Sequence, residues 1–188
     1  TLAEGADLSL ANADFVFIGE DRFDKAGHAL SSAGDVDGDG LDDILIGAPA
    51  NLWGGGSHSG KAYLILGSKL VDRPSKTLHL HSANHIFVGE RDNDRVGFSV
   101  SGVGDVDGDG LADILIGASS APGEGTPGAE EAHDEAGRAY LVYGSSLGGF
   151  QEFDLSNADH IFIGEQEDGM AGQAVSAAGD VDGDGLDD

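Results

Sequence analysis

The chain has 188 residues, 39% of them hydrophobic, which is enough for a folded core and unlike a disordered segment. Its 35 acidic and 9 basic residues give a formal net charge of −26, which disfavours binding to nucleic acid or insertion into an anionic membrane. Cysteine is absent, so no disulfide forms, and no apolar run is as long as a transmembrane helix.

The first segment that repeats lies near the start of the chain. Leu10 to Glu20 recurs as Leu80 to Glu90 and again as Leu155 to Glu165. Each copy contains a β-branched and aromatic run, as in Phe15–Gly19, that predicts a short strand. A segment that recurs in this way is typical of a repeat architecture, in which each period forms one structural unit.

Three further strand candidates follow in each period, separated by Gly, Asp, Ser and Pro turns. The first consists of small residues, as expected for the crowded strand nearest a propeller axis. The candidates cover residues 26–33, 96–103 and 171–178, then 43–48 and 113–118, then 60–67 and 137–144. We therefore predict an all-β fold of β-propeller blades, each with four antiparallel strands.

The sequence holds about two and a half such blades, too few to close a ring of about four to eight. We predict one repeat region over 1–188. Residues 1–20 give the outer strand of a preceding blade, 21–90 and 91–165 two blade repeats, and 166–188 the start of a third. An open fragment of this kind leaves an edge that neighbouring subunits could complete.

An acidic loop lies between the second and third strands of each period. Gly34–Asp43, Gly104–Asp113 and Gly179–Asp188 place aspartates at loop positions 1, 3, 5 and 9 and leucine at position 7. So many carboxylates repel one another unless a cation lies between them, and a set made only of oxygen ligands favours calcium. The predicted ligands are Asp35, Asp37, Asp39, Leu41 and Asp43, then Asp105, Asp107, Asp109, Leu111 and Asp113, then Asp180, Asp182, Asp184, Leu186 and Asp188, each leucine through its backbone carbonyl.

The beginning of each loop is also that of an EF-hand, but the rest of the loop differs. An EF-hand needs a glutamate at position 12 and a helix after it. Position 12 is Ile46 in the first loop and Ile116 in the second, inside predicted strands. We therefore interpret the motif as a calcium loop between two strands, about one ion per loop, with an acidic turn that binds no metal as the alternative.

Two loops differ in length between the periods. The shorter contains Trp53, which could stack on a sugar or a partner chain, or pack locally. The longer, Ser119 to Ala136, is rich in acidic residues and could hold a second cation, although we interpret it as a surface loop. A transition-metal site at His79, His81 and His85 is a further alternative to a solvated strand end.

The combined motifs resemble the FG-GAP repeat family, the blades of the integrin α-subunit propeller and of many bacterial surface proteins. The residues that carry the resemblance are Val96-Gly97-Phe98, Gly104 to Gly110 and Asp113 to Ala118, with Gly47-Ala48-Pro49 in the first copy. The resemblance implies a propeller of about seven blades, with Ca²⁺ in the hairpin loop of each blade that carries the aspartate motif. The chain departs from the family where Ala26, Val96 and Ala171 replace its aromatic residue and where Ser119 replaces a proline.

We expect a calcium-binding, non-catalytic structural or adhesion module, secreted or on a cell surface, whose partners are other protein chains or identical subunits. The lack of cysteine favours a bacterial source. No cysteine and no G-x-S-x-G motif offers a nucleophile, and the recurrence of Glu20, Glu90 and Glu165 favours a structural role for them. The alternatives are the accessory propeller of a secreted hydrolase and a lectin-like propeller that binds glycan through Trp53, Tyr63, Tyr140 or Tyr143.

Overall fold

The computed structural model describes residues 10–50, 59–71, 73–90, 94–119, 136–149, 151–166 and 169–188. The strands in this part of the chain are β1 (Val16–Ile18), β2 (Ala29–Gly34), β3 (Asp43–Ala48), β4 (Lys61–Ile65), β5 (Thr77–His79), β6 (His85–Val88), β7 (Val96–Gly104), β8 (Asp113–Ala118), β9 (Arg138–Val142), β10 (Glu152–Asp154) and β11 (His160–Ile163).

The helical elements among the described residues are short 3-10 turns, and none of them could span a membrane. They are η1 (Leu10–Asn12), η2 (Gly67–Lys69), η3 (Leu80–Ser82), η4 (Gly144–Ser146) and η5 (Leu155–Asn157). The prediction of an all-β chain is confirmed.

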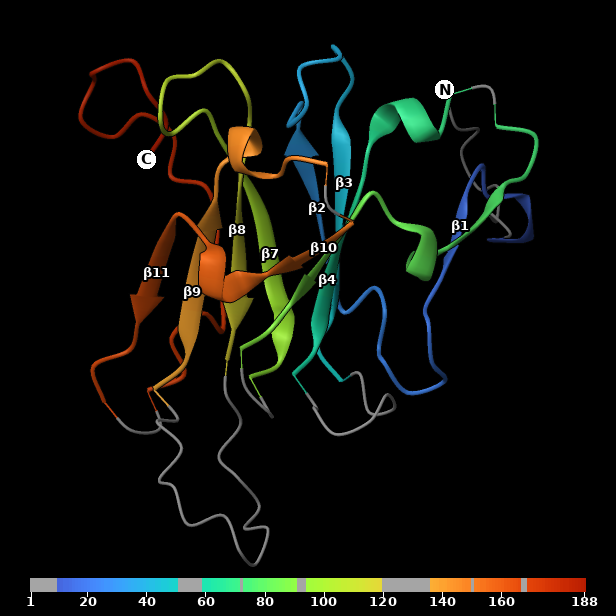
Figure 1. Cartoon of the computed structure of the whole chain (residues 1–188), viewed down its shortest axis with the longest axis horizontal. Coiled ribbons are helices and arrows are strands. Elements are labelled where there is room, and N and C mark those ends of the chain that lie inside the picture. The colour runs from blue at the N-terminus through green and yellow to red at the C-terminus, as the bar shows by residue number, and fades with distance from the viewer. Residues whose placement is uncertain are drawn as a thin grey trace, which may run out of the picture.

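Two open sheets form the body of the protein and stand side by side (Figure 1). One has the strand order β10-β6-β4-β3-β2 and the other β11-β9-β8-β7. Within each, the four main strands pair antiparallel in a simple up-and-down order. Each sheet therefore has the blade arrangement that the sequence predicted, and neither closes into a barrel.

Two short strands were not predicted and connect one blade to the next. β5 pairs in parallel with β1, and β10 pairs in parallel with β6. Each of them precedes the outer strand of its own repeat but adds to the outer edge of the preceding one. Strands of three residues are too short to show an alternating pattern, so no sequence signal marks them.

The predicted strand over 171–178 is mostly irregular in the structure. It forms one isolated bridge, between Ala171 and Gly137, and its remaining residues do not form a strand. The equivalent strands β2 and β7 pair with the strand that directly follows their aspartate loop. The third loop closes at Asp188, the last of the 188 residues, so this sequence contains no equivalent of β3 or β8 for residues 171–178 to pair with.

The hydrophobic core lies between the sheets. Leu45, Leu64, Phe87, Ile114 and Tyr140, which are fully buried, belong to a cluster shared by the two blades. A second cluster packs the first blade against the turn and strand around β5. Burial of each large side chain stabilises the fold by about 1.5–3 kcal/mol, so the packing of one blade on the next is a main source of stability.

Glycines allow the backbones of adjacent blades to touch. A Cβ atom added at Gly47 in β3 would lie 2.0 Å from the carbonyl oxygen of Gly97 in β7. Gly117 and Gly172 stand in the same relation, also at 2.0 Å. Gly97 also has a φ of +79°, which side chains rarely adopt. The repeated glycines at these positions are therefore explained by contact between blades.

Glu20 and Glu90 also connect successive blades. Oε2 of Glu20 accepts a hydrogen bond from Nζ of Lys61 at 2.8 Å, and its Oε1 accepts one from the Tyr63 hydroxyl at 3.1 Å. Oε1 of Glu90 accepts from Arg138 and from the Tyr140 hydroxyl, both at 3.0 Å. The two repeated glutamates therefore have a structural contact in common.

Candidate metal centres

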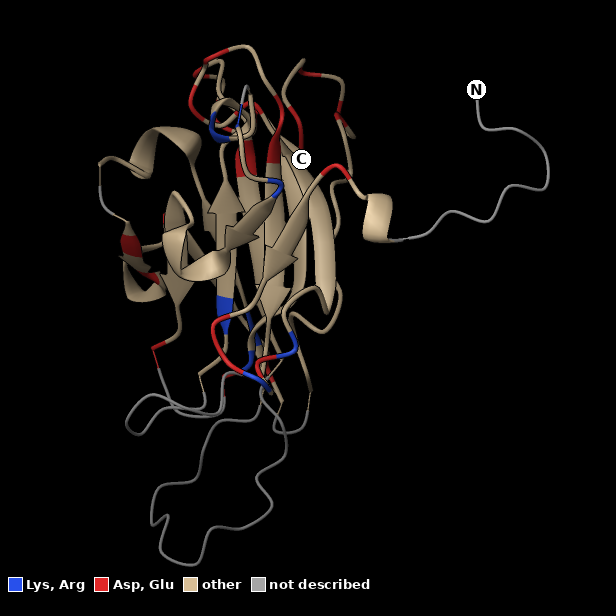
Figure 2. Ribbon diagram, turned by 90° about the vertical axis from the view of Figure 1, so that its right-hand side faces the viewer, with Lys and Arg blue, Asp and Glu red and all other residues tan. Residues whose placement is uncertain are grey.

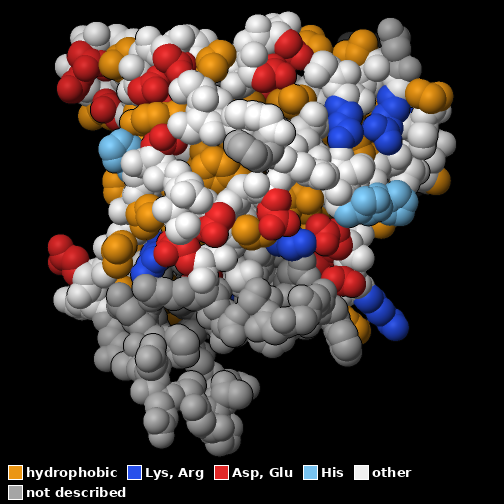
Figure 3. Space-filling view, viewed as in Figure 1, with side chains coloured by type: hydrophobic (Ala, Val, Ile, Leu, Met, Phe, Trp, Pro, Cys, Tyr) orange, Lys and Arg blue, Asp and Glu red, His pale blue; other side chains and the backbone are white. Residues whose placement is uncertain are grey.

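The three aspartate loops lie at the same end of the molecule. Figure 1 shows them along the top, in chain order from the β2–β3 hairpin to the end of the chain, and Figure 2 shows acidic residues gathered at that end. The acidic side chains also follow the upper edge of the space-filling view in Figure 3. The repeat places each loop beyond the same end of its blade, so the negative charge is concentrated there.

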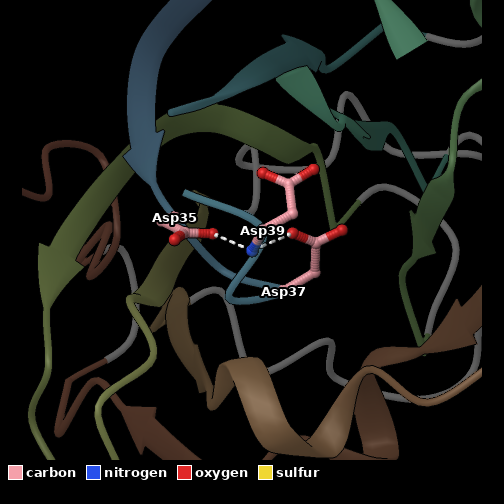
Figure 4. Close-up of side chains that lie close together, drawn as sticks. All are labelled: Asp35, Asp37 and Asp39. Atoms are coloured by element: carbon pink, nitrogen blue, oxygen red, sulfur yellow. Dashed lines mark hydrogen bonds between the residues drawn. The ribbon is translucent and has the colours of Figure 1, made fainter. Parts of the chain in front are cut away.

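The first aspartate of the first loop organises the backbone around it. Oδ1 of Asp35 accepts hydrogen bonds from the amides of Gly38 and Asp39 at 2.8 and 3.0 Å, and its Oδ2 accepts one from Gly40 at 2.9 Å. Oδ1 of Asp37 also accepts from the Asp39 amide, at 3.2 Å (Figure 4). The loop is thus folded around its own carboxylates, with their side chains close together.

Gly38 and Gly40 have φ values of +75° and +87°. Such values are accessible to glycine without strain, and they let the loop turn tightly enough to bring its amides onto Asp35. This is the conformation that the two glycines of the motif predicted.

The last aspartate of the first loop is buried beneath it. Asp43 is 1% exposed, and it accepts hydrogen bonds from the amide of Val36 at 2.9 Å and from that of Gly67 at 2.8 Å. Burial raises the pKa of Asp43, the two amide bonds oppose that rise, and the charges of Asp37 and Asp39 add to it. A cation beside this carboxylate would favour its ionised form.

The second and third loops repeat this geometry at the same positions. Oδ1 of Asp105 accepts from Gly108 at 2.8 Å, and Oδ1 of Asp180 accepts from Gly183 at 2.6 Å. Oδ2 of Asp105 accepts from the amide of Gly110 at 2.9 Å, and Oδ2 of Asp180 accepts from that of Gly185 at 3.0 Å. Asp113 is 0% exposed, and burial raises its pKa as it does that of Asp43.

In each loop, three carboxylates offer oxygens that lie within 4.8 Å of one another. The groups are Asp35, Asp37 and Asp39, then Asp105, Asp107 and Asp113, then Asp180, Asp182 and Asp188. Within the described part of the chain, Oδ2 of Asp37 and Oδ2 of Asp39 accept no hydrogen bond and are available to a ligand. A group of hard oxygens at this spacing fits Ca²⁺, whose ligands lie at about 2.3–2.6 Å.

The leucine at loop position 7 has a second role that the sequence did not indicate. The amide of Leu41 donates to Oδ1 of Asp39 at 2.9 Å, and that of Leu111 donates to Asp109 at 2.8 Å. Leu186 bonds Asp184 in the same way, at 2.9 Å. These leucines therefore orient the aspartate at position 5.

Sequence reasoning missed the glycines that support the buried aspartates. Gly67 donates to Asp43, and Gly144 donates to Asp113 at 3.0 Å. Both follow the last apolar residues of the fourth predicted strand, and their recurrence after the Tyr-Leu run was the available signal. A Cβ at Gly67 would lie 2.6 Å from the carbonyl oxygen of Asp42, so the site requires glycine there.

The structure gives less support to the other candidate sites, those at the histidines, the longer acidic loop and the aromatic residues. The rings of His79 and His81 stack at 5.5 Å, and both residues are exposed, while His85 is buried in β6. Trp53 and the acidic residues of the longer loop, Glu130, Glu131, Asp134 and Glu135, lie outside the described residues. Tyr63 and Tyr140 are fully buried and hydrogen-bonded to the repeated glutamates, which leaves them unable to stack on a sugar.

The fold and the loops define a class of protein: an all-β repeat chain whose blades each present an acidic hairpin loop at one end. The FG-GAP repeat family model matches residues 26–65 and 96–142, each of which covers the three inner strands of one blade and the loop between the first two. The chain belongs to the FG-GAP repeat family.

Similar proteins include integrin α subunits and a phospholipase. Integrin alpha pat-2 of Caenorhabditis elegans is 39% identical over 101 residues, 54% of this chain and 8% of that protein. Integrin alpha-5 of Xenopus laevis is 32% identical over 190 residues, 100% of this chain and 16% of that protein. Phosphatidylinositol-glycan-specific phospholipase D of Bos taurus is 32% identical over 163 residues, 86% and 18% of the two chains. The chain thus spans less than a fifth of each of these relatives.

Proposed function

We propose that the chain is a calcium-binding, non-catalytic segment of an extracellular β-propeller that serves adhesion or surface structure. The observation that carries the proposal is the recurrence, at one end of the molecule, of three loops that are hydrogen-bonded in the same way and that each bring three carboxylates close together. The similarity of the chain to integrin α subunits supports the same function. The division into repeats at 21–90, 91–165 and 166–188 is part of the proposal.

In this proposal the ion is structural. The aspartates at positions 1, 3, 5 and 9 and the leucine carbonyl hold it, and it offsets the repulsion among carboxylates that the fold crowds into each loop. An affinity of about 10⁻⁴–10⁻³ M is typical of extracellular calcium modules. Calcium in this range keeps the loops ordered outside cells.

Isothermal titration of the chelator-treated chain with calcium tests the proposal. The expected result is three ions per chain, one for each carboxylate group, with magnesium binding more weakly because it tolerates fewer protein oxygens. A chain that takes up no calcium at millimolar concentration contradicts the proposal. Nickel and copper, which prefer nitrogen ligands, serve as controls for binding at the exposed histidines.

A further part of the proposal concerns the open end of the molecule. Val36, at position 2 of the first loop, is 1% exposed under the second blade, whereas Val181 at the same position of the third loop is 73% exposed. Phe87 in β6 is 0% exposed and Phe162 in β11 is 54% exposed. We propose that another blade covers this end, from the same protein or from an identical subunit stacked head to tail.

The phospholipase similarity keeps a second function open: the accessory propeller of a secreted hydrolase. In that case the chain positions a catalytic domain and has no catalytic residue of its own. Hydrolase activity measured on this chain alone would contradict both proposals, the adhesion or structural module and the accessory propeller. Binding to a glycan array that is lost in Trp53→Ala would favour the lectin-like alternative instead.

A further inference from the structure

The first and second aspartate loops are each hydrogen-bonded, through the backbone, to the loop of the next blade. The amide of Ala112, at position 8 of the second loop, donates to the carbonyl oxygen of Asp35 in the first loop at 2.9 Å. The amide of Asp187, at position 8 of the third loop, donates to the carbonyl oxygen of Asp105 at 3.2 Å. The loops are therefore in direct contact in the order in which Figure 1 shows them.

The donor in each contact belongs to the peptide unit that carries a predicted ligand. The carbonyl of Leu111 and the amide of Ala112 are the two ends of one planar peptide group. A peptide whose carbonyl coordinates a cation is polarised, and its N–H becomes a stronger donor. Coordination by Leu111 in the second loop would therefore strengthen the hydrogen bond to Asp35 in the first.

The peptide group that accepts each of these hydrogen bonds also donates one, through its N–H, to the last aspartate of its own loop. The carbonyl of Asp35 shares a peptide group with the amide of Val36, and that amide donates to Oδ2 of Asp43 at 2.9 Å. Two hydrogen bonds and two peptide groups thus join Leu111 to Asp43. The second and third loops repeat the arrangement, with Val106 donating to Oδ2 of Asp113 at 2.8 Å.

Packing fixes the relative position of the loops as well. A Cβ atom added at Gly38 would lie 3.0 Å from Cδ2 of Leu111, and one added at Gly108 would lie 3.1 Å from Cδ2 of Leu186. The leucine at position 7 of the second and third loops therefore lies against the glycine at position 4 of the preceding loop. A shift in one leucine displaces the turn beneath it.

The contact between the second and third loops has one additional bond. Oδ2 of Asp187 accepts a hydrogen bond from the amide of Asp105 at 3.2 Å. The residue at this position in the second loop is alanine, Ala112, which cannot form the equivalent bond to the first loop. Asp187 therefore holds Asp105, the first aspartate of the neighbouring loop, from outside that loop.

We propose that the calcium sites of successive blades are coupled through this peptide relay, and that Asp187 is a positioning residue for the loop at Asp105–Asp113. The inference rests on the proposed calcium binding. Occupancy of the third loop raises the calcium affinity of the second, and the second that of the first. Coupling in binding is reciprocal, so each site changes its neighbour's affinity by the same factor.

Site-resolved calcium titration of the 188-residue chain by NMR tests the coupling. The amides of Gly38, Gly108 and Gly183, each hydrogen-bonded to the first aspartate of its loop, report the three sites separately. Asp180→Asn removes the charge of the first aspartate of the third loop. We expect the calcium midpoint at Gly108 to rise by about fivefold or more, within the usual range of coupling between sites. The midpoint at Gly38 should rise by less.

Asp187→Ala and Asp42→Ala form a matched pair of variants at loop position 8. Asp187→Ala should weaken binding at Gly108, whereas Asp42→Ala should leave it unchanged, because no aspartate loop precedes that of Asp42 among the described residues. An unchanged midpoint at Gly108 in both Asp180→Asn and Asp187→Ala overturns the coupling while leaving calcium binding intact. If calcium shifts none of the three amides in the unmodified chain, the proposed function itself fails.

Discussion

At the scale of single residues, the aspartates of each loop divide into two kinds. Asp35 is half-buried and accepts hydrogen bonds from three backbone amides, whereas Asp43 is buried between the loop and the amide of Gly67. Both are predicted ligands, and burial raises the pKa of Asp43. Loss of charge at either position should lower the calcium affinity of the loop more than loss of charge at an exposed neighbour would.

Asp105→Asn tests the assignment of the predicted ligands. The amide keeps the size of the side chain but removes its charge, so calcium affinity at that loop should fall about tenfold or more. Near-millimolar calcium should then occupy two loops instead of three. Asp42→Asn is the control, because Asp42 lies in an aspartate loop but is not a predicted ligand. Equal losses in the two variants, measured by calorimetry, would contradict the assignment.

The repeated glycines give a second prediction at this scale. Gly97→Ala would place a Cβ atom 2.3 Å from the carbonyl oxygen of Lys61, besides straining a φ of +79°. Gly27 has the equivalent position in the first repeat and a φ of +83°, but a Cβ atom added there would have no atom within 4 Å. Gly97→Ala should therefore lower the free energy of unfolding by about 1–3 kcal/mol more than Gly27→Ala. Chemical denaturation measures both, and equal losses would show that contact between blades is not what requires glycine.

At the scale of elements, the strands that pair within a blade were predictable and those that pair between blades were not. β3, β4, β8 and β9 each carry a near-continuous apolar run that recurs in the next repeat. β5 and β10 have three residues each and pair with the preceding blade, a partner that no local pattern specifies. The hydrogen bond from Ala112 to Asp35 was equally hidden, since it uses only backbone atoms.

The glutamate contacts between blades predict the alkaline stability of the fold. Burial, together with the negative charge of Glu20 beside Tyr63 and those of Asp94 and Glu90 beside Tyr140, raises the pKa of both tyrosines above the unfolded value of about 10. The stability that depends on protonated tyrosine is therefore complete below pH 10 and is lost as the pH rises further, because only the unfolded chain releases these protons.

For two tyrosines the free energy of unfolding should fall by up to about 2.7 kcal/mol per pH unit above pH 10. Denaturant melts at several alkaline pH values measure this slope. A variant with both Tyr63→Phe and Tyr140→Phe has no such protons to lose. It should start from a lower stability but decline less steeply, and an identical slope in the two proteins would refute the explanation.

At the scale of the whole molecule, the blades form an open stack with unequal ends. The loop end concentrates negative charge, and the face at β11 and the third loop exposes apolar side chains, Val181 and Phe162, whose equivalents in the first blade, Val36 and Phe87, are buried. Exposed apolar side chains whose equivalents in another repeat are buried indicate an interaction surface. The same stacking that joins the first two blades would therefore cover this face.

Sedimentation velocity tests whether this face associates with another copy. The chain should form head-to-tail oligomers as its concentration rises, and Val181→Asp should reduce association at least about tenfold by burying an unpaired charge. Val71→Asp changes another exposed valine, 57% exposed and outside that face, and should have no effect. Sensitivity to both substitutions, or to neither, would mean that the face at Val181 does not mediate the contact.

The most direct measurement is a crystal structure of the chain in millimolar calcium, with anomalous diffraction to locate the ions. We expect one anomalous peak within coordination distance, about 2.3–2.6 Å, of the carboxylates in each loop: Asp35–Asp43, Asp105–Asp113 and Asp180–Asp188. Ordered loops that hold only water at these positions, in crystals equilibrated with calcium, would contradict the calcium-binding function.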